Sequence, residues 1–268
     1  MIKLIATDMD GTLLDDEKRL PPDFSEVMDR LKRHDIRFTI ASGRSYSALT
    51  PIFEPYSEKM SFICDNGAFI VQNGKEEFIS SIASETVSRI VRICRDKIPE
   101  AYPVLCGRRG IYAAGGFSLH SEKELGFYYN SRQICDDLAD TGDDIFKIAI
   151  YDENDPKTCS YPVLDKIFGK ELTLVVSGHL WMDIMNPGIN KGAALNTIQK
   201  SLGISKEETM AFGDFYNDID LLAQAEYSYV MDNANDDMKL HGKYIAGSNN
   251  SGGVTRAIKQ YLDENGLF

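Results

Sequence analysis

An acidic pair placed directly after a short apolar run is the feature of this sequence that most constrains its fold. The run Ile2–Thr7 ends at Asp8, and Asp10 and Gly11 follow at once. A short apolar run of this kind is typical of a buried strand in a parallel sheet. Carboxylates at the end of such a strand lie where open α/β sheets bind ligands. The alternative for this short segment alone is an Asp that only caps the following loop.

The order of the predicted elements indicates an α/β core. Two prolines at 21–22 open a stretch with helical spacing of apolar residues, and residues 36–41 alternate as a strand does. Strand, helix and strand within about 40 residues form a βαβ unit, which requires a parallel sheet. The same alternation returns after residue 187. We therefore expect a doubly wound, mostly parallel sheet formed by residues 1–82 and 187–268.

The middle third of the chain has a different order of predicted helices and strands. Residues 83–186 contain two predicted helices, one from Ser84 to before Pro99 and one over 156–168, several short strands with hairpin turns, and a polar, acidic stretch over 136–144. This pattern is typical of an α+β unit. We expect an inserted α+β domain at 83–186.

A second acidic segment follows another short apolar strand. In Gly213–Asp218, Asp214 and Asp218 lie four residues apart and reach the same predicted sheet edge as Asp8. Asn217 or Asp218 would also suit the start of the next helix, whereas Asp214 lies too early to cap it. Four converging carboxylates repel one another unless a divalent cation binds. Because hard oxygen ligands occur here without clustered His or Cys, the pattern favours Mg²⁺ over zinc.

Two weaker segments are compatible with phosphate binding. Ser42-Gly43-Arg44 ends the second predicted strand, where a hydroxyl and loop N–H groups can hold phosphate oxygens. Lys191 opens the helix after the inserted domain and would supply a point charge. Taken alone, the first segment is more often an ordinary turn and the second a surface lysine.

These four segments, in this order, resemble the four motifs of the haloacid dehalogenase superfamily. The sequence is similar to its Cof-type branch of small-molecule phosphatases, whose cap domain is inserted between the second and third motifs. The stretch 182–195 and Asn66-Gly67-Ala68 strengthen the match. The resemblance covers the two core segments well and the cap only by position and size. Phe215 stands where many relatives have a polar residue, which affects the expected substrate fit.

The resemblance implies roles for individual residues. Asp8 would be the nucleophile that becomes an aspartyl phosphate, and Asp10 would act as general acid and then general base. Mg²⁺ would be held by Asp8, the backbone carbonyl of Asp10 and Asp214, with Asp218 in or next to the ligand set. The implied phosphate-binding groups are Ser42, Lys191, Asn217 and the backbone N–H groups of Met9 and Gly43. Arg44 and Asn66 are candidate substrate contacts.

Composition excludes several other classes of function. The net charge of −12 and the pI near 4.8 argue against binding to nucleic acid or to an anionic membrane surface. Five cysteines without CxxC spacing predict reduced thiols, and no signal peptide or membrane span is recognisable. We therefore expect a cytoplasmic protein, of unassigned oligomeric state.

The expected function is hydrolysis of a small phosphomonoester, a sugar phosphate or a phosphorylated cofactor. One alternative is a phosphotransferase, such as a hexose-phosphate mutase of similar architecture, which would use the same Asp8 intermediate. The other is a catalytically idle binding protein on the same fold. The intact set of Asp8, Asp10, Lys191 and Asp214 argues against the idle protein.

Overall fold

The chain folds into two compact units, one of which is formed by two separate stretches of the sequence. The computed structural model describes residues 1–116, 122–123, 125–126, 129, 131–177 and 179–268. One unit combines Met1–Phe78 with Asn190–Phe268, and the other is Ile79–Ile189. The role of the inserted unit as a cap stays a prediction. Within the described ranges, no helix is both long and apolar enough to cross a membrane.

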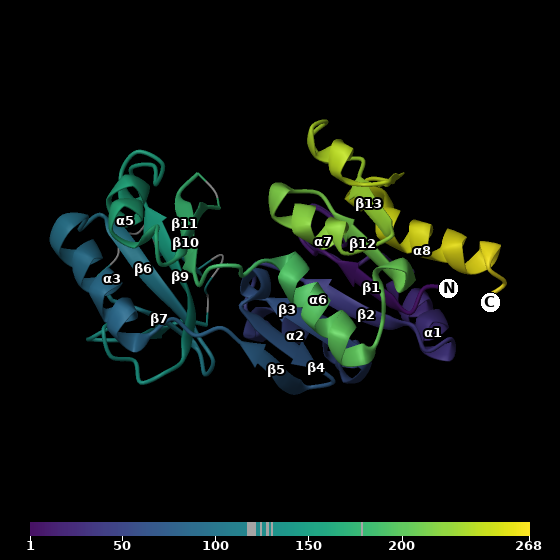
Figure 1. The fold of residues 1–268 in the computed structure, drawn as a ribbon, viewed down its shortest axis with the longest axis horizontal. Coiled ribbons are helices and arrows are strands. Elements are labelled where there is room, and N and C mark those ends of the chain that lie inside the picture. Colours follow the sequence, from purple (N-terminus) through teal and green to yellow (C-terminus); the bar gives the residue numbers. More distant parts are fainter. Residues whose placement is uncertain (117–121, 124, 127–128, 130, 178) are drawn as a thin grey trace. The chain divides into compact units, whose positions relative to one another are not determined.

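The first unit, here called the core unit, is built on an eight-stranded sheet with the order β14-β13-β12-β1-β2-β3-β4-β5 (Figure 1). The pairs from β14 to β3 are parallel, and β3 pairs antiparallel with β4. The strands are β1 (Leu4–Thr7), β2 (Arg37–Ala41), β3 (Met60–Cys64), β4 (Phe69–Gln72), β5 (Lys75–Ile79), β12 (Thr209–Gly213), β13 (Tyr227–Met231) and β14 (Tyr244–Ala246). The predicted, mostly parallel sheet is therefore confirmed, with β1 near its centre.

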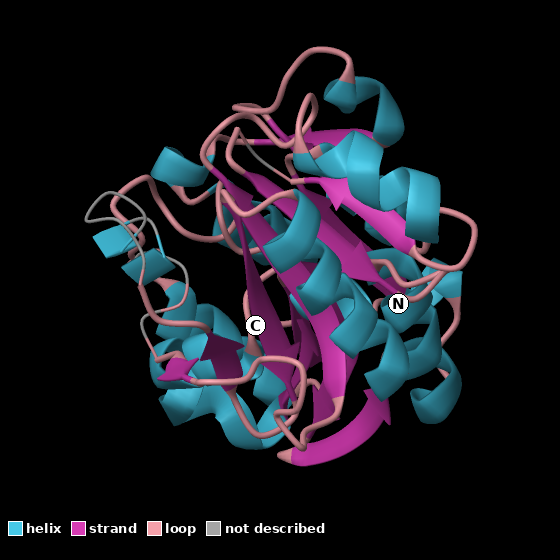
Figure 2. Cartoon of the chain, turned by 90° about the vertical axis from the view of Figure 1, so that its left-hand side faces the viewer, coloured by secondary structure: helices cyan, strands magenta, loops and turns pink. Residues whose placement is uncertain are grey.

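Helices cover both faces of this sheet (Figures 1 and 2). They are α1 (Phe24–Arg33), α2 (Tyr46–Phe53), α6 (Lys191–Leu202), α7 (Ile219–Ala223) and α8 (Gly253–Glu264). On one face, Leu195 of α6 and Leu221 of α7 pack in one cluster with Leu4 of β1. On the other, Phe24 of α1 lies edge-on to Phe38 of β2, with ring centroids 5.7 Å apart. Full burial of such side chains stabilises the fold by about 1.5–3 kcal/mol each.

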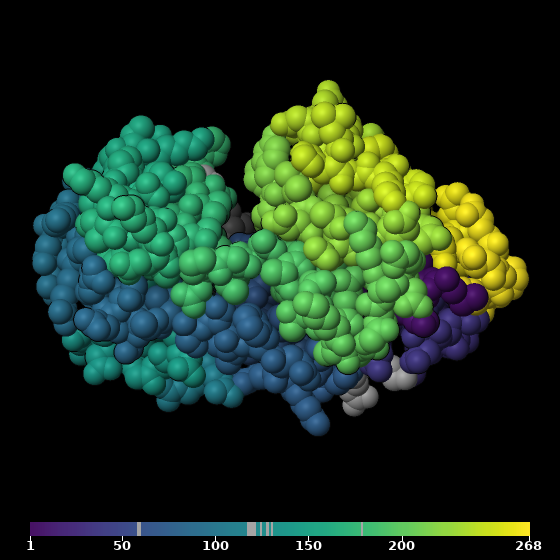
Figure 3. Space-filling model, viewed as in Figure 1, coloured from purple at the N-terminus to yellow at the C-terminus, as the bar shows by residue number. Residues whose placement is uncertain are grey.

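Strands β4 and β5, at one edge of the core sheet, form a hairpin. Asn73 and Gly74 link β4 to β5 with φ angles of 49° and 72°. A two-residue type I′ turn requires positive φ at both central positions, which Asn-Gly adopts readily. At the other end of the core unit the two termini lie side by side, purple and yellow in Figure 3. There the backbone N–H of Ile2 donates to the Tyr261 hydroxyl at 2.9 Å.

The second unit is an α+β domain, as predicted. Its sheet has the order β10-β11-β9-β6-β7-β8, and its pairs are antiparallel except for β7 with β8. The helices α3 (Ser84–Lys97) and α5 (Ser160–Phe168) pack on this sheet through a common apolar cluster. The strands are β6 (Ala101–Gly107), β7 (Ile111–Ala113), β8 (Gln133–Ile134), β9 (Ile145–Asp152), β10 (Thr173–Val176) and β11 (Trp181–Met185).

Candidate active site

The predicted site residues of the core unit follow the carboxyl ends of neighbouring parallel strands. Asp8 follows β1, and its backbone N–H donates to the Phe212 carbonyl of β12 at 3.0 Å. Ser42 follows β2, and Asp214 follows β12. Because parallel strands end at one edge of a sheet, residues separated by 200 positions in the sequence meet there.

Three carboxylates form the centre of this edge. Oxygens of Asp8, Asp214 and Asp218 all lie within 4.8 Å of one another. The ammonium of Lys191 lies between two of them, with Nζ 2.5 Å from Asp8 Oδ1 and 2.6 Å from Asp218 Oδ1. Lys191 is only 1% exposed, so it is a buried member of the cluster and not the surface lysine that its motif alone would suggest. Helix α6 presents it because Asn190 caps the helix by accepting from the Ala193 N–H at 2.7 Å.

The electrostatics of the cluster show an excess of negative charge. Burial raises the pKa of Asp8 well above its usual range, and the charges of Asp218 and Asp214 raise it further against the effect of Lys191. Burial also raises the pKa of Asp214, although a hydrogen bond from Thr12 opposes this. The pKa of Lys191 is raised because the attraction of Asp218 and Asp8 outweighs the effect of burial. One ammonium therefore does not balance the cluster, and a divalent cation would relieve it.

The donor set fits Mg²⁺. Both oxygens of Asp218 already accept hydrogen bonds from the protein. Oδ2 accepts them from the N–H groups of Asp214 and Phe215 at 3.1 and 3.2 Å, and Oδ1 accepts one from Lys191 Nζ. Asp8 and Asp214 are the carboxylates of the cluster best placed to offer an oxygen to a metal. Oxygen ligands supplied by one or two carboxylates, with water completing the shell, are what Mg²⁺ selects.

Thr12 and Gly11 join the two acidic loops, a role that sequence reasoning did not assign to them. The Thr12 hydroxyl donates to Asp214 Oδ1 at 2.7 Å. Gly11 has a φ of +83°, and a Cβ there would lie 2.5 Å from Asp214 Oδ2. Gly11 is therefore required both for its backbone conformation and for the space that Asp214 occupies. The signal was present in the first motif, which ends in these two residues.

The carboxylate of Asp10 forms ion pairs with two cationic side chains, Arg44 and Lys18. Arg44 donates to it through two atoms, Nε to Oδ2 at 2.8 Å and Nη2 to Oδ1 at 2.7 Å. Lys18 lies 2.8 Å from Asp10 Oδ1. Burial raises the pKa of Asp10, but the hydrogen bonds from Lys18 and Arg44 bring it below its usual value. Arg44, predicted as a substrate contact, here holds Asp10, and Lys18 was not singled out from the sequence.

The remaining predicted residues lie on loops in mutual contact. Ser42 Oγ accepts the Arg44 N–H at 3.1 Å, and Asn217 Nδ2 donates to Asn66 Oδ1 at 3.2 Å. Asn66 adopts a left-handed conformation, φ 56°, and a Cβ at Gly43 would lie 3.3 Å from its side-chain amide. Met9 is fully buried, so only its backbone is available to a ligand.

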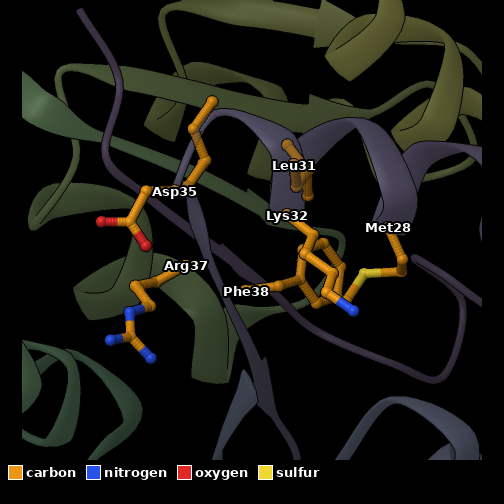
Figure 4. A pocket seen from close by; sticks show the side chains of 7 residues that line it. Met28, Leu31, Lys32, Asp35, Arg37 and Phe38 are labelled. Atoms are coloured by element: carbon orange, nitrogen blue, oxygen red, sulfur yellow. The ribbon is translucent and has the colours of Figure 1, made fainter.

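A small pocket of the core unit lies elsewhere (Figure 4). It has a volume of about 70 Å³ and is lined by residues of α1, of the turn that follows it and of the amino end of β2, among them Met28, Lys32, Asp35 and Arg37. The acidic cluster lies beyond the opposite, carboxyl ends of the strands. This pocket is therefore not part of the candidate site.

Comparison with known proteins assigns the family. The model of the haloacid dehalogenase-like hydrolases matches residues 5–258. The chain belongs to this family. It is 32% identical to the Escherichia coli K12 protein 5-amino-6-(5-phospho-D-ribitylamino)uracil phosphatase YbjI, over 100% of this chain and 98% of that relative. It is 27% identical to the HMP-PP phosphatase of Klebsiella pneumoniae, over 98% of this chain and 97% of that one.

A solved structure agrees with this haloacid dehalogenase-like assignment. The crystal structure of SMU.1108c from Streptococcus mutans UA159 matches with a TM-score of 0.88 and 30% identity, covering 98% of this chain and 100% of that one. The predicted family, the α/β fold and the expectation of a phosphatase-class hydrolase are thus confirmed.

Proposed function

We propose that this protein is a Mg²⁺-dependent phosphatase that hydrolyses small phosphomonoesters through an aspartyl phosphate on Asp8. The observation that supports this most is the buried Asp8 carboxylate, which contacts Lys191 and shares the acidic cluster with Asp214 and Asp218. A carboxylate nucleophile needs a lone pair that can reach phosphorus, and the phosphoryl oxygens need positive charge beside them; Asp8 would supply the first, and Lys191 with a bound cation the second.

In the first step, an oxygen of Asp8 attacks phosphorus and the bond to the leaving oxygen breaks. The negative charge of the bound phosphate raises the pKa of Asp10 from the lowered value that Lys18 and Arg44 give it in the free protein. Asp10 then gives its proton to the leaving oxygen, so an alcohol departs and an aspartyl phosphate remains. In the second step, Asp10 takes a proton from water, the water oxygen attacks phosphorus, and phosphate leaves with Asp8 regenerated. Ser42, Lys191, Asn217 and the N–H groups of Met9 and Gly43 are proposed to bind the phosphoryl oxygens.

The proposed metal ligands are Asp8, the backbone carbonyl of Asp10, and Asp214. Asp218 is proposed to lie next to these ligands and to hold the loop that carries Asp214, because its oxygens already accept hydrogen bonds from Lys191 and from the backbone of that loop. When bound, Mg²⁺ would neutralise part of the charge that builds up on the phosphoryl oxygens. The raised pKa values of Asp8 and Asp214 are consistent with a site that stabilises such a cation.

We propose a small phosphorylated metabolite as substrate, a sugar phosphate or a phosphorylated cofactor precursor. The names of two relatives, a phosphoribitylaminouracil phosphatase and an HMP-PP phosphatase, support the second type. The inserted unit, Ile79–Ile189, is proposed to select among such substrates, because the proposed roles of the core residues concern only the phosphoryl group.

A panel of phosphoesters assayed with Mg²⁺ tests this function. We expect release of inorganic phosphate, loss of that release on chelation, and a mass increase of one phosphoryl group on wild type but not on Asp8→Asn after rapid quenching. Formation of a sugar-phosphate isomer without phosphate release would instead indicate the phosphotransferase. Failure to act on every ester in the panel would indicate the idle binding protein.

A further inference from the structure

Lys18 is an exposed lysine with an unexpected position, because its ammonium reaches the carboxylate of Asp10. Nζ lies 2.8 Å from Asp10 Oδ1, and the side chain is 44% exposed. An exposed ion pair of this kind is often incidental to function. Here, however, the partner is the proposed acid–base group, and the loop that carries Lys18 is shaped to bring the lysine to it.

The turn at 15–19 is held by its own hydrogen bonds. The Asp15 N–H donates to the Arg19 carbonyl at 3.1 Å, and the Lys18 N–H donates to the Asp15 carbonyl at 2.9 Å. Asp15 Oδ1 also accepts the Arg19 N–H at 2.9 Å. Lys18 itself has a φ of 63°, a region that residues other than glycine rarely adopt. The turn therefore folds back on the loop that follows Asp8, with Lys18 in a sparsely populated conformation.

Asparagines from the C-terminal part of the chain fix the same loop to the core unit. Asn249 Nδ2 donates to the Leu14 carbonyl at 3.1 Å and to Asp16 Oδ1 at 3.0 Å. Asn250 exchanges two hydrogen bonds with Asp16, at 2.9 and 3.0 Å. Asn233 donates to the Gly11 carbonyl at 2.8 Å. The segment from Gly11 to Asp16, which connects Asp10 to the turn that carries Lys18, is thus anchored at both of its ends.

The consequence concerns which oxygen of Asp10 faces a substrate. Oδ1 accepts both Arg44 Nη2 and Lys18 Nζ, whereas Oδ2 accepts Arg44 Nε. A carboxylate offers about four lone-pair sites, two on each oxygen, so these contacts occupy both sites of Oδ1 and one site of Oδ2.

We propose that Lys18 is a positioning residue for the reaction. Together with Arg44 it fixes the Asp10 carboxyl group, so that Oδ2 faces the leaving oxygen. This proposal rests on the proposed function, in which Asp10 protonates the leaving group. A positioning role predicts that Lys18 matters most when the leaving group depends on that proton.

Substitution of Lys18 by Met, which keeps the length and removes the charge, tests the proposal with two esters. Glycerol phosphate has a strongly basic leaving group, and p-nitrophenyl phosphate has one that departs with little protonation. We measure kcat/KM, because it reports the steps up to formation of the phospho-enzyme. We expect a fall of about tenfold or more for glycerol phosphate and of less than about threefold for p-nitrophenyl phosphate.

Two further variants distinguish positioning from a general effect on the fold. Lys243→Met removes a similarly exposed lysine, 51% against 44%, that is paired with Glu226, and it should leave both rates unchanged. In an Asp10→Asn background, Lys18→Met should change the rate by less than about twofold, since the group that it positions is gone. Lys18→Arg, which keeps the charge, should recover most of the glycerol phosphate activity.

An equal fall on both esters, no fall on either, or a full effect of Lys18→Met in the Asp10→Asn background would overturn the positioning role. If wild type hydrolyses neither ester with Mg²⁺ present, the proposed function fails, and the role of Lys18 fails with it. The two failures are distinguishable because only the second removes wild-type activity.

Discussion

Lys191 offers the sharpest perturbation of the candidate site. Its ammonium lies between Asp8 and Asp218, and the three side chains are almost fully buried, with exposures of 1%, 9% and 0%. Lys191→Met keeps most of the volume and removes the charge. The carboxylates of Asp8 and Asp218 then face each other and Asp214 without a cation.

The size of the effect follows from the geometry. Carboxylate oxygens of the cluster lie within 4.8 Å of one another. At that separation and an effective dielectric constant of about 20, two unit charges repel by about 3.5 kcal/mol. Removal of one partner from a buried ion pair typically costs about 3–5 kcal/mol, which agrees with this value. We therefore expect Lys191→Met to lower the free energy of unfolding by about 3–4 kcal/mol at neutral pH in metal-free buffer.

Urea unfolding with and without Mg²⁺ measures this effect. Mg²⁺ should stabilise the variant more than wild type, because the bound cation takes over part of the role of the lysine. The pKa of Asp8 is raised in the folded state, so the folded protein binds a proton at Asp8 more readily than the unfolded chain does. The repulsion is thus fully present above that raised pKa and is lost as the pH falls through it towards the unfolded value. Acidification should therefore reduce the difference in the free energy of unfolding between the variant and wild type.

Lys200→Met is the matched control, because Lys200 lies exposed in the last turn of the same helix. It should change the free energy of unfolding by less than about 0.5 kcal/mol. Two results would refute the charge argument. One is equal stability of Lys191→Met and wild type in buffer that contains a chelator; the other is a difference in the free energy of unfolding that increases on acidification.

Three further predictions concern the acidic loops. Asp8→Asn should reduce phosphate release to background while raising stability in metal-free buffer, since it removes one repelling charge; near-normal turnover would exclude Asp8 as nucleophile. Thr12→Val removes a hydrogen bond to Asp214 worth about 1.5–3 kcal/mol, so Mg²⁺ affinity by calorimetry should fall about tenfold, with Thr12→Ser as control; unchanged affinity would exclude this role. Gly11→Ala combines positive φ with a 2.5 Å approach to Asp214 and should destabilise the fold by about 2 kcal/mol or more; tolerance in urea unfolding would contradict the close packing.

The parallel core could be predicted because its strands carry their own signal. Runs such as Ile2–Thr7 and 209–212 are short, apolar and followed by acidic or glycine residues, and their strands do pair in parallel. The Asn73-Gly74 turn carries an equally clear local signal, because few other dipeptides adopt positive φ at both positions. The convergence of Asp8 and Asp214 then followed from strand direction alone.

Side-chain pairing within the site could not be predicted in the same way. The motif predicts a phosphate-binding role for Lys191, but its burial between Asp8 and Asp218 depends on how α6 packs beside the sheet. Lys18 lies outside the recognised motifs, and its contact with Asp10 depends on a left-handed residue in a turn. Such tertiary contacts have no periodicity in the sequence, so only the folded chain reveals them.

The most direct test of the account is the position of a bound divalent ion. Mn²⁺ accepts the same oxygen ligands as Mg²⁺ and is located by its anomalous scattering in a crystal. We predict one ion coordinated by carboxylate oxygens of both Asp8 and Asp214. An ion bound to one of these residues alone, or bound away from both, would contradict the shared site on which the proposed chemistry depends.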